Sequence, residues 1–298
     1  MAIPIGKREF GNLRQLVALA KAEDFGEGDV TGRLLPAELR AEASFVAREP
    51  LVFCGGPLLP GIAEAYDAGI ATKLKFADGE AAEAGAALAA WSGPARGVVA
   101  AERVALNFLQ RLSGVATTTR RYVEAVAGSG ATILDTRKTT PGWRALEKYA
   151  VRAGGGRNHR RGLYDAVLVK DNHLGILSAA GRADPLAAAA ERLAAAREQL
   201  GPDGFVEVEV DTLEQLREAL SLPIDVVLLD NMPPGRLREA VSIRDAAGLR
   251  GRVALEASGG ITLATVGEVA GAGVERISVG ALTHSVPAVD IALDVAFG

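Results

Sequence analysis

Short hydrophobic runs alternate with amphipathic stretches over the last two thirds of the chain, from about residue 131 onward. The runs are rich in valine, leucine and isoleucine, which is typical of strands buried on both faces. They occupy residues 132–134, 166–169, 205–210, 225–229, 253–255 and 276–279. Because helical patterns separate them, we expect parallel strands in a closed or nearly closed α/β barrel. A doubly wound open sheet is the alternative, since periodicity does not reveal whether a barrel closes.

Two of the intervening helices have recognisable ends. Asp184 followed by Pro185 predicts the start of an alanine-rich helix, which Gly201 ends. Thr212 and Gln215 have the spacing of a capping box, in which each side chain bonds the backbone N–H of the other residue. These signals support the alternation of strands and helices.

Residues 1 to about 110 have a different pattern and predict a smaller α+β domain, with the barrel over residues 111–284. The C-terminal tail, 285–298, could belong to either part. Short strands are expected at 43–47, 72–76 and 86–91, with helices at 58–68 and 98–126. Arg103, Asn107 and Arg111 recur every four residues and therefore form a polar stripe on the longer helix.

Composition narrows the class of protein. Of 298 residues, 49% are hydrophobic and 23% charged, and the formal net charge is −4, so a general binder of nucleic acid or anionic membranes is not favoured. Cys54 is the only cysteine, which excludes an intramolecular disulfide and fits a reducing cytoplasm. No stretch approaches the roughly 20 apolar residues of a membrane-spanning helix, and the N-terminal segment lacks a signal-peptide core. We expect a cytoplasmic, soluble protein.

Positive charge is concentrated in one segment of this acidic chain. Nine lysines or arginines but three acidic residues lie between Arg137 and His173, together with His159. A solvated basic face is the ordinary meaning of such a run. Here, however, Thr139–Gly142 and Gly154–Gly156 interrupt it, and turns of this kind let backbone N–H groups and basic side chains converge on an anion. The segment also follows two predicted strands, where α/β barrels place their active sites.

The residue types indicate the kind of anion. Arginine donates paired hydrogen bonds to planar carboxylates, whereas lysine acts as a point charge on phosphate. Arg137-Lys138 and the later Asn158-His159-Arg160 therefore suit a ligand that carries both groups. Lys170 follows an apolar strand and has two possible roles: a Schiff-base lysine if it is desolvated, or a charged clamp on an anion.

Oxygen ligands and glycines follow the later strands. Glu209 and Asp230 lie at the ends of successive strands and could converge on a hard cation such as Mg²⁺; alternatively, each carboxylate caps a helix. Ser258-Gly259-Gly260 and Ser278-Val279-Gly280-Ala281 are similar to the late-strand phosphate cup of α/β barrels, where backbone amides hold phosphate.

These motifs closely resemble those of quinolinate phosphoribosyltransferases, and the resemblance covers nearly the whole chain. The central block is long and specific. It comprises Asp135–Gly142, Leu146–Val151, Gly154–Arg160, Leu163–Ala166 and Lys170–His173; further matches are Glu23-Asp24, Gly28–Thr31, Glu102-Arg103, Asn107, Ser113-Gly114, Glu207–Val210, Leu229–Met232, Ser258–Gly260 and Ser278–His284.

The resemblance implies an open TIM-like α/β barrel with an N-terminal α/β-sandwich domain. It also implies a homodimer, or a higher homo-oligomer, in which Arg103 reaches the barrel of the other subunit. The implied activity is transfer of the phosphoribosyl group of phosphoribosyl pyrophosphate to quinolinate with decarboxylation, which gives nicotinate mononucleotide, pyrophosphate and CO₂ in NAD biosynthesis.

The resemblance also assigns residues. The quinolinate site would be lined by Arg103, Thr136, Arg137, His159, Arg160 and Lys170. Lys138, Glu209 and Asp230 would serve phosphoribosyl pyrophosphate and its Mg²⁺; with Lys170, they are the expected catalytic residues. The 5-phosphate would be bound by Ser258, Gly259, Gly260, Ser278, Val279, Gly280 and Ala281, with His284 nearby.

The sequence departs from the family pattern in two places, and three rival functions are possible. One departure is the alanine-rich helix before Phe205, which is longer than usual and should affect the outside of the barrel rather than its chemistry. Arg157 and Arg161 flank the Asn-His-Arg motif where family members often have uncharged residues, but the named ligands are intact. The rivals are a related transferase acting on another pyridine or in molybdenum metabolism, a Schiff-base aldolase using Lys170, and a non-catalytic sensor of phosphate ligands.

Overall fold

The chain divides into two compact units that interleave along the sequence. The computed structural model describes residues 3–170, 173, 185–202 and 204–297. One unit, here the sandwich unit, takes residues 1–120, 138–156 and 282–298; the other, the barrel unit, takes 121–137 and 157–281. The predicted residues Asp171, Asn172 and Asp184 lie outside the described residues.

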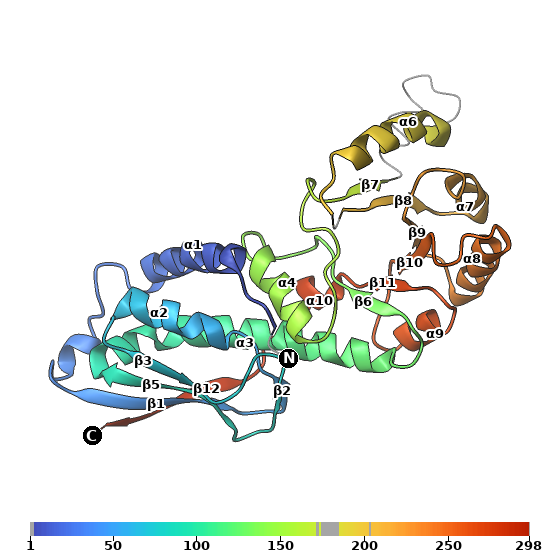
Figure 1. Cartoon of the computed structure of the whole chain (residues 1–298). Coiled ribbons are helices and arrows are strands. Elements are labelled where there is room, and N and C mark those ends of the chain that lie inside the picture. The colour runs from blue at the N-terminus through green and yellow to red at the C-terminus, as the bar shows by residue number, and fades with distance from the viewer. Residues whose placement is uncertain (1–2, 171–172, 174–184, 203, 298) are drawn as a thin grey trace. The chain divides into compact units, whose positions relative to one another are not determined.

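The sandwich unit is built on a four-stranded antiparallel sheet in the order β12-β1-β5-β3. Helices α1, α2 and α3 lie on one side of it (Figure 1). The bounds are α1 Lys7–Asp24, η1 Gly32–Leu34, β1 Arg40–Ala47, β2 Leu51–Val52, η2 Gly56–Leu58, α2 Leu59–Tyr66, β3 Ala71–Leu74, β4 Ala81–Ala82, β5 Ala87–Pro94, α3 Ala95–Ala125, α4 Arg144–Ala153, α10 Ala281–His284 and β12 Ile291–Phe297. The arrangement confirms an α/β-sandwich domain.

Alternating burial explains how this sheet packs. In β1 every second residue is buried, and Phe45 on the buried side meets Trp91 of β5 edge to face, with 4.9 Å between the ring centroids. An alternating strand has one face against the core and one toward solvent, so the helices cover only the apolar face. The predicted strands of this region and the long helix are confirmed as β1, β3, β5 and α3.

The barrel unit contains six parallel strands in the order β6-β11-β10-β9-β8-β7. The strands are β6 Thr132–Leu134, β7 Val167–Val169, β8 Val206–Val210, β9 Val226–Asp230, β10 Ala254–Ser258 and β11 Arg276–Ser278; the helices between them are α6 Pro185–Glu198, α7 Leu213–Ala219, α8 Pro234–Ala246 and α9 Val266–Ala270. All six predicted strands are confirmed, and Thr212 with Gln215 caps α7 as expected.

The strand order identifies an open barrel. The first strand, β6, pairs with the last, β11, as it would in a closed barrel. The second strand, β7, nevertheless lies at the opposite end of the sheet, so the ring is open between β6 and β7. A doubly wound sheet would have placed the first strand in its interior. The open TIM-like α/β barrel is therefore the correct alternative.

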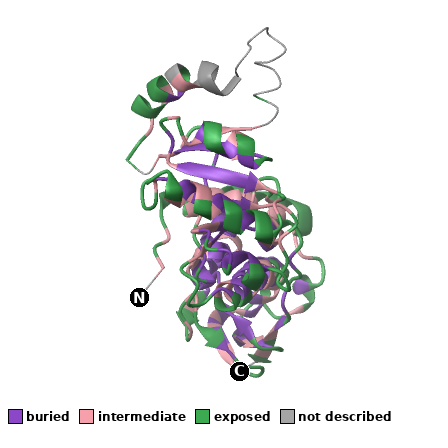
Figure 2. Cartoon of the chain, turned by 90° about the vertical axis from the view of Figure 1, so that its right-hand side faces the viewer, coloured by how far each residue is buried: buried purple, intermediate pink, exposed green. Residues whose placement is uncertain are grey.

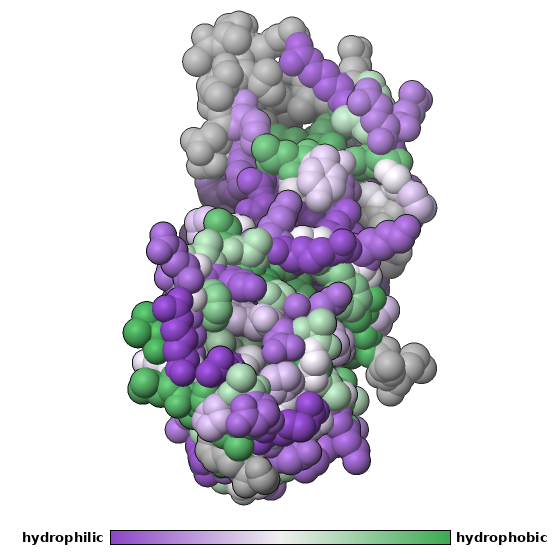
Figure 3. Space-filling view, turned by 90° about the vertical axis from the view of Figure 1, so that its left-hand side faces the viewer, coloured by the Kyte–Doolittle hydropathy of each residue, from purple (hydrophilic) through white to green (hydrophobic). Residues whose placement is uncertain are grey.

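The strands of the barrel unit are covered by helices with exposed outer residues. In Figure 2 a buried strand lies between helices whose outward residues are exposed. On the face shown in Figure 3, hydrophobic surface is broken up by hydrophilic side chains. None of the described helices combines the length and apolar character needed to cross a membrane.

Candidate active site

One face of the parallel sheet in the barrel unit is polar. In β8 the valines are buried on one face, while Glu207 and Glu209 occupy alternate positions and therefore share the other face. Glu209 pairs in register with Leu228 of β9, and Asp230, two residues later, lies on the same face as Leu228. The two predicted metal ligands thus come from adjacent strands and face the same side of the sheet.

Lys170, at the end of β7, is paired with one of these carboxylates. Its Nζ lies 2.5 Å from Glu209 Oε2, and the side chains are 41% and 10% exposed, respectively. The Lys170 side chain is thus partly exposed and ion-paired, whereas a Schiff-base lysine must be desolvated. The geometry favours the clamp over the Schiff base. Asp230 Oδ2 accepts a hydrogen bond from Asn231 Nδ2 at 2.7 Å.

Arg137 and Arg160, two arginines of the predicted carboxylate site, interact electrostatically. Burial lowers the pKa of Arg160, and the nearby charge of Arg137 lowers it further. Arg160 is 8% exposed and directs Nη1 toward the carbonyl oxygen of Ala166 at 3.5 Å. Guanidinium groups that interact in this way repel each other, and the charges of Glu207, Asp165 and Glu209 offset part of the effect on Arg160. Their arrangement suits a dicarboxylate.

A buried aspartate fixes the backbone of this arginine segment. Asp135 Oδ1 accepts from the backbone N–H of His159 at 2.9 Å, and Oδ2 accepts from Asn158 Nδ2 at 2.7 Å. The segment also runs beside β6, because Arg157 forms a parallel bridge with Leu134. Asp135 is fully buried. It appeared in the motif quoted from the sequence, but its role as an anchor emerges only from these bonds.

His159 faces two carboxylates that the sequence did not single out. Its Nε2 lies 3.0 Å from Glu207 Oε2 and 3.3 Å from Glu256 Oε1, and both glutamates are fully buried. Burial of the ring opposes its charged form, but hydrogen bonds to Glu207 and Glu256 outweigh this and raise the pKa of His159 to about 9. The alternation of valine and glutamate in β8 was the sequence signal that could have placed Glu207 on the same face as Glu209.

The position of the proton in this cluster follows from the other ring nitrogen. The backbone N–H of Arg160 donates to His159 Nδ1 at 2.7 Å, which a doubly protonated imidazolium could not accept. Burial and the charge of Glu256 also raise the pKa of Glu207. With the Arg160 bond made, the ring proton is on Nε2, which faces the two carboxylates.

The glycine turn after β10 has the conformation expected of a phosphate loop. Gly259 and Gly260 have φ of +96° and +61°, which favour glycine. A Cβ on Gly259 would collide with the Asn231 side chain, so the close approach of the two strand ends also requires glycine. Ser258 through Gly260 line a cavity of about 180 Å³. Ser278 and Val279 are buried after β11.

The remaining predicted site residues, Arg103, Lys138 and His284, belong to the sandwich unit. Arg103 is exposed on α3. The Lys138 carbonyl oxygen accepts from Thr283 Oγ1 at 2.7 Å, which ties the lysine to the chain just before His284. His284 is exposed, with Nδ1 2.6 Å from Ser285 Oγ.

Arg111 organises the loop that follows Lys138. It pairs with the fully buried Glu147 of α4 at 2.6 Å and donates to the carbonyl oxygens of Thr283 and Val286. Glu147 in turn accepts from the Thr140 backbone N–H at 3.0 Å and from its Oγ1 at 2.8 Å. The sequence had identified Arg111 only as part of a polar stripe; its partners show that it holds this loop in place.

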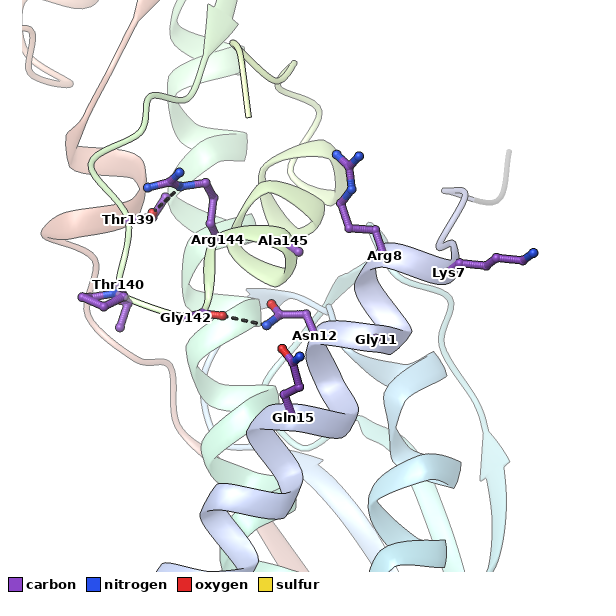
Figure 4. A pocket seen from close by; sticks show the side chains of 11 residues that line it. Lys7, Arg8, Gly11, Asn12, Gln15, Thr139, Thr140, Gly142, Arg144 and Ala145 are labelled. Carbon is purple, nitrogen blue, oxygen red and sulfur yellow. Dashed lines mark hydrogen bonds between the residues drawn. The ribbon is translucent and has the colours of Figure 1, made fainter. Parts of the chain in front are cut away.

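A second hollow, of about 540 Å³, lies between α1 and the 139–142 loop. Asn12 Nδ2 donates to the Gly142 carbonyl oxygen at 2.7 Å, and Arg144 Nε donates to Thr139 Oγ1 at 3.0 Å. Figure 4 shows that the side chain of Lys7 points away from Arg144 and that the guanidinium groups of Arg8 and Arg144 do not meet. The cations around this hollow therefore do not converge on one anion.

Comparison with known families accounts for both parts of the chain. Residues 115–294 match the family model described as quinolinate phosphoribosyl transferase, C-terminal domain, and residues 29–113 match the model of the N-terminal domain. The chain belongs to the quinolinate phosphoribosyltransferase family. The two matched models together cover residues 29–294.

Individual members of the quinolinate phosphoribosyltransferase family are similar over almost their full length. Nicotinate-nucleotide pyrophosphorylase (carboxylating) of Mycobacterium leprae is 42% identical over 291 residues, covering 96% of this chain and 98% of that protein. The structure of nicotinate-nucleotide pyrophosphorylase from Francisella tularensis has a TM-score of 0.86 at 36% identity, covering 99% of both chains. The crystal structure of NadC from Streptococcus pyogenes has a TM-score of 0.88 at 33% identity, covering 99% of this chain and all of that one.

Proposed function

We propose that this protein transfers the phosphoribosyl group of phosphoribosyl pyrophosphate to quinolinate and removes one carboxylate as CO₂. The products are nicotinate mononucleotide, pyrophosphate and CO₂, and the reaction serves NAD biosynthesis. The polar face of the barrel carries this proposal, because it presents two arginines beside a lysine–carboxylate pair in a chain of this family. We place the reaction in the cytoplasm.

Quinolinate is a planar pyridine with two adjacent carboxylates, which suits the arginine pair. Arg137 and Arg160 would bind the carboxylates, and their mutual repulsion in the free protein makes binding of a dianion favourable. Thr136 and Lys170 would complete the pocket. The remaining groups must then bind a second anion beside the first, which explains why this acidic chain concentrates its positive charge here.

The reaction has two bond-changing stages. The pyridine nitrogen forms a bond to C1 of the ribose as the bond from C1 to pyrophosphate breaks, and pyrophosphate leaves with the bonding electrons. The new ring nitrogen is positively charged, so the bond from C2 to its carboxylate can break with release of CO₂ and leave an electron pair at C2 next to N⁺. A proton then adds at C2. The protein must neutralise the leaving pyrophosphate, which Lys138 would do as a point charge.

The acidic residues of the site fit a magnesium ion. Glu209 and Asp230 present carboxylate oxygens, the ligands that Mg²⁺ prefers, from the same face of adjacent strands. When bound, Mg²⁺ would supply charge neutralisation on the pyrophosphate. Lys170 would exchange its contact with Glu209 for substrate. The 5-phosphate would bind to the backbone of Ser258–Gly260 and Ser278–Ala281, with His284 nearby.

We further propose that the protein works as a homodimer, or a higher homo-oligomer, with Arg103 acting in the site of the neighbouring subunit. Arg103 lies on α3 in the sandwich unit, exposed, and so presents its guanidinium at the surface. A surface arginine completing a neighbour's carboxylate site would make activity depend on assembly.

Substrate assays distinguish the proposed function from its rivals. The purified protein, with Mg²⁺ and phosphoribosyl pyrophosphate, is offered quinolinate, nicotinate or nicotinamide, and nucleotide products are separated by chromatography. We expect product from quinolinate; product from another pyridine instead would indicate the related transferase. Binding of phosphoribosyl pyrophosphate without turnover of any pyridine would indicate a sensor. Borohydride treatment with carbonyl compounds should leave Lys170 unlabelled, and labelling would support the aldolase.

A further inference from the structure

The inner face of the barrel unit contains a closed group of buried charges. His159 bridges two strands, because Nε2 lies 3.0 Å from Glu207 of β8 and 3.3 Å from Glu256 of β10. Glu256 is shared, since its Oε2 accepts from Arg276 Nε of β11 at 2.6 Å. The reaction described above uses neither glutamate. Two fully buried carboxylates are costly to maintain, so their function needs an explanation.

An aromatic ring completes this cluster. Phe205 meets the His159 ring edge to face with 5.4 Å between centroids, and the Arg276 guanidinium lies 5.1 Å from the centre of the Phe205 ring. The imidazole is thus held by carboxylates at one nitrogen and by an aromatic ring at its side. Such packing fixes the orientation of the histidine ring.

The same three side chains have the composition of a metal site, but their surroundings disfavour one. The ligand atoms of His159, Glu207 and Glu256 lie within 4.8 Å of one another. However, Arg276 already neutralises Glu256, and His159 donates toward both carboxylates. A divalent cation would have to displace the histidine proton and approach a guanidinium. The charges are therefore balanced by the protein itself.

Both ring nitrogens of His159 are engaged within the protein. Nε2 faces the carboxylates, and Nδ1 accepts from the Arg160 backbone N–H at 2.7 Å. The ring is also buried, with 7% of the residue exposed. A general acid must present its proton to the substrate within hydrogen-bond reach. The position of the ring instead suits a residue that holds the neighbouring backbone in place.

The segment containing His159 is therefore held by two separate sets of contacts. Asp135 holds the backbone N–H of His159 and the side chain of Asn158. The carboxylates hold the His159 ring, and the next residue is Arg160, whose guanidinium would bind a substrate carboxylate. A rigid supporting shell of this kind keeps a binding group within the small tolerance that recognition requires.

We propose that Glu207 and Glu256, with Arg276, form a buried clamp on His159 that positions Arg160 for the substrate carboxylate. His159, Glu207 and Glu256 are then positioning residues, and His159 does not donate the proton that C2 acquires. The identity of the bound carboxylate rests on the proposed function. Of the charged groups near the clamp, Arg276 pairs with Glu256, and Arg137, Asp165 and Glu209 act electrostatically on Arg160.

The clamp is tested with the isosteric variants Glu256→Gln and Glu207→Gln. We expect the KM for quinolinate to rise by about tenfold in Glu256→Gln, because a small misplacement of a binding group has effects of this order or larger. The rise should be smaller in Glu207→Gln, which leaves the Glu256–Arg276 pair intact. The KM for phosphoribosyl pyrophosphate should change by less than about twofold. Glu239→Gln, which removes an exposed carboxylate on α8, is the matched control and should resemble the wild type.

Two outcomes of these assays would overturn the proposal. An equal rise in both KM values would indicate general damage to the barrel, and an unchanged KM for quinolinate in Glu256→Gln would show that the clamp does not act on Arg160. If the wild type makes no nicotinate mononucleotide, the proposed function fails. If the wild type is active and the variants are normal, only the clamp fails.

A measurement on the wild-type protein covers the case in which a variant does not fold. In ¹⁵N-histidine NMR, we expect the His159 ring to retain Nε2–H and to show no titration near pH 6.5. Ordinary titration of His159 near 6.5 would refute the clamp. Elemental analysis of protein dialysed against Mg²⁺, Mn²⁺ or Zn²⁺ should find no tightly held ion that Glu207→Gln loses; such an ion would establish a metal site instead.

Discussion

At the scale of single residues, the function depends on cations held close together before substrate arrives. Burial and the charge of Arg137 act together on Arg160, and both lower its pKa. In the free protein this is unfavourable, because like charges are held in a partly desolvated place. A bound dicarboxylate removes the repulsion. Under the proposed assignment, part of the binding free energy for quinolinate would come from relief of this repulsion.

Arg160→Ala tests this interpretation. We expect the catalytic efficiency with quinolinate to fall by the equivalent of about 2–5 kcal/mol, the cost of leaving a buried charged partner unpaired. The matched control is Arg161→Ala, which removes the neighbouring exposed arginine and should change efficiency by less than about 1 kcal/mol. Initial-rate kinetics over a range of quinolinate concentrations measure both. Near-normal efficiency in Arg160→Ala would refute the assignment.

The His159 cluster predicts a pH dependence of stability. Its pKa is raised from an ordinary 6.5 to about 9, so the folded protein binds this proton more tightly than the unfolded chain does. The contribution to stability is complete below about pH 6.5 and is lost as pH rises toward 9; it amounts to no more than about 3 kcal/mol. Urea unfolding of the wild type and of His159→Gln between pH 6 and 10 should converge at the alkaline end. A difference that grows with pH would contradict the sign.

Site residues could be predicted from the sequence where they belong to a motif. They were harder to predict where only the pairing of strands brings them together. Lys170 and Glu209 were both expected at the site, and they lie 2.5 Å apart. Glu207 was quoted only within a motif, without a role, and Glu256 was not singled out. They lie 49 positions apart in the sequence and meet only because β8 and β10 place them on the same inner face. Local sequence patterns do not show that two strands separated by a third, here β8 and β10, both contact the same histidine.

At the scale of elements, the glycine turn after β10 affects both the packing of the strand ends and the predicted phosphate site. Gly259 has a φ of +96° and touches Asn231 at the end of β9, so the turn allows two strand ends to approach. Any side chain here would strain the backbone and push the neighbouring strand end away. The turn therefore controls both local stability and the shape of the predicted phosphate cup.

Gly259→Ala should therefore lower stability and weaken substrate binding. We expect a loss of about 1–3 kcal/mol in the free energy of unfolding from strain at positive φ together with the clash. The KM for phosphoribosyl pyrophosphate should rise more than that for quinolinate. Gly251→Ala is the control, because Gly251 also has positive φ, +77°, but open space around its Cβ position. Equal effects in the two variants would show that strain alone is responsible and that the approach to Asn231 does not matter.

The elements themselves were predictable to different extents. The six barrel strands follow from hydrophobic runs, because strands covered on both faces are apolar throughout. Helix α1 was not predicted, because it is rich in charged residues and only Leu13 and Val17 are buried, which leaves a weak hydrophobic pattern. Strand β12 was not predicted either. Its partner β1 lies some 250 residues earlier, and no local signal announces a pairing of such range.

At the scale of the whole molecule, the predicted homodimer makes each active site the product of two chains. Arg103 and Lys138 both belong to the sandwich unit, yet the proposal assigns them to sites in different subunits. Sequence motifs can identify both residues as functional. They cannot show from which chain each residue arrives, because that depends on assembly.

Mixing two inactive variants tests this assignment. Arg103→Ala and Lys138→Ala should each lose most activity when assayed alone. After subunits are exchanged at equal concentrations, we expect recovery of about a quarter of wild-type activity, because half of the dimers are mixed and each has one intact site. Each variant mixed with an equal volume of buffer controls for dilution. No recovery, although mixed dimers are demonstrated by native mass spectrometry, would place Arg103 in the site of its own chain.

The most direct test of the central claim is the stoichiometry of a single incubation. Quinolinate labelled with ¹⁴C in the 2-carboxylate is incubated with the protein, Mg²⁺ and phosphoribosyl pyrophosphate. The account predicts that labelled CO₂, nicotinate mononucleotide and pyrophosphate appear in equal amounts, and that none forms when phosphoribosyl pyrophosphate is omitted. Consumption of phosphoribosyl pyrophosphate without labelled CO₂, or release of CO₂ without the sugar donor, would contradict it.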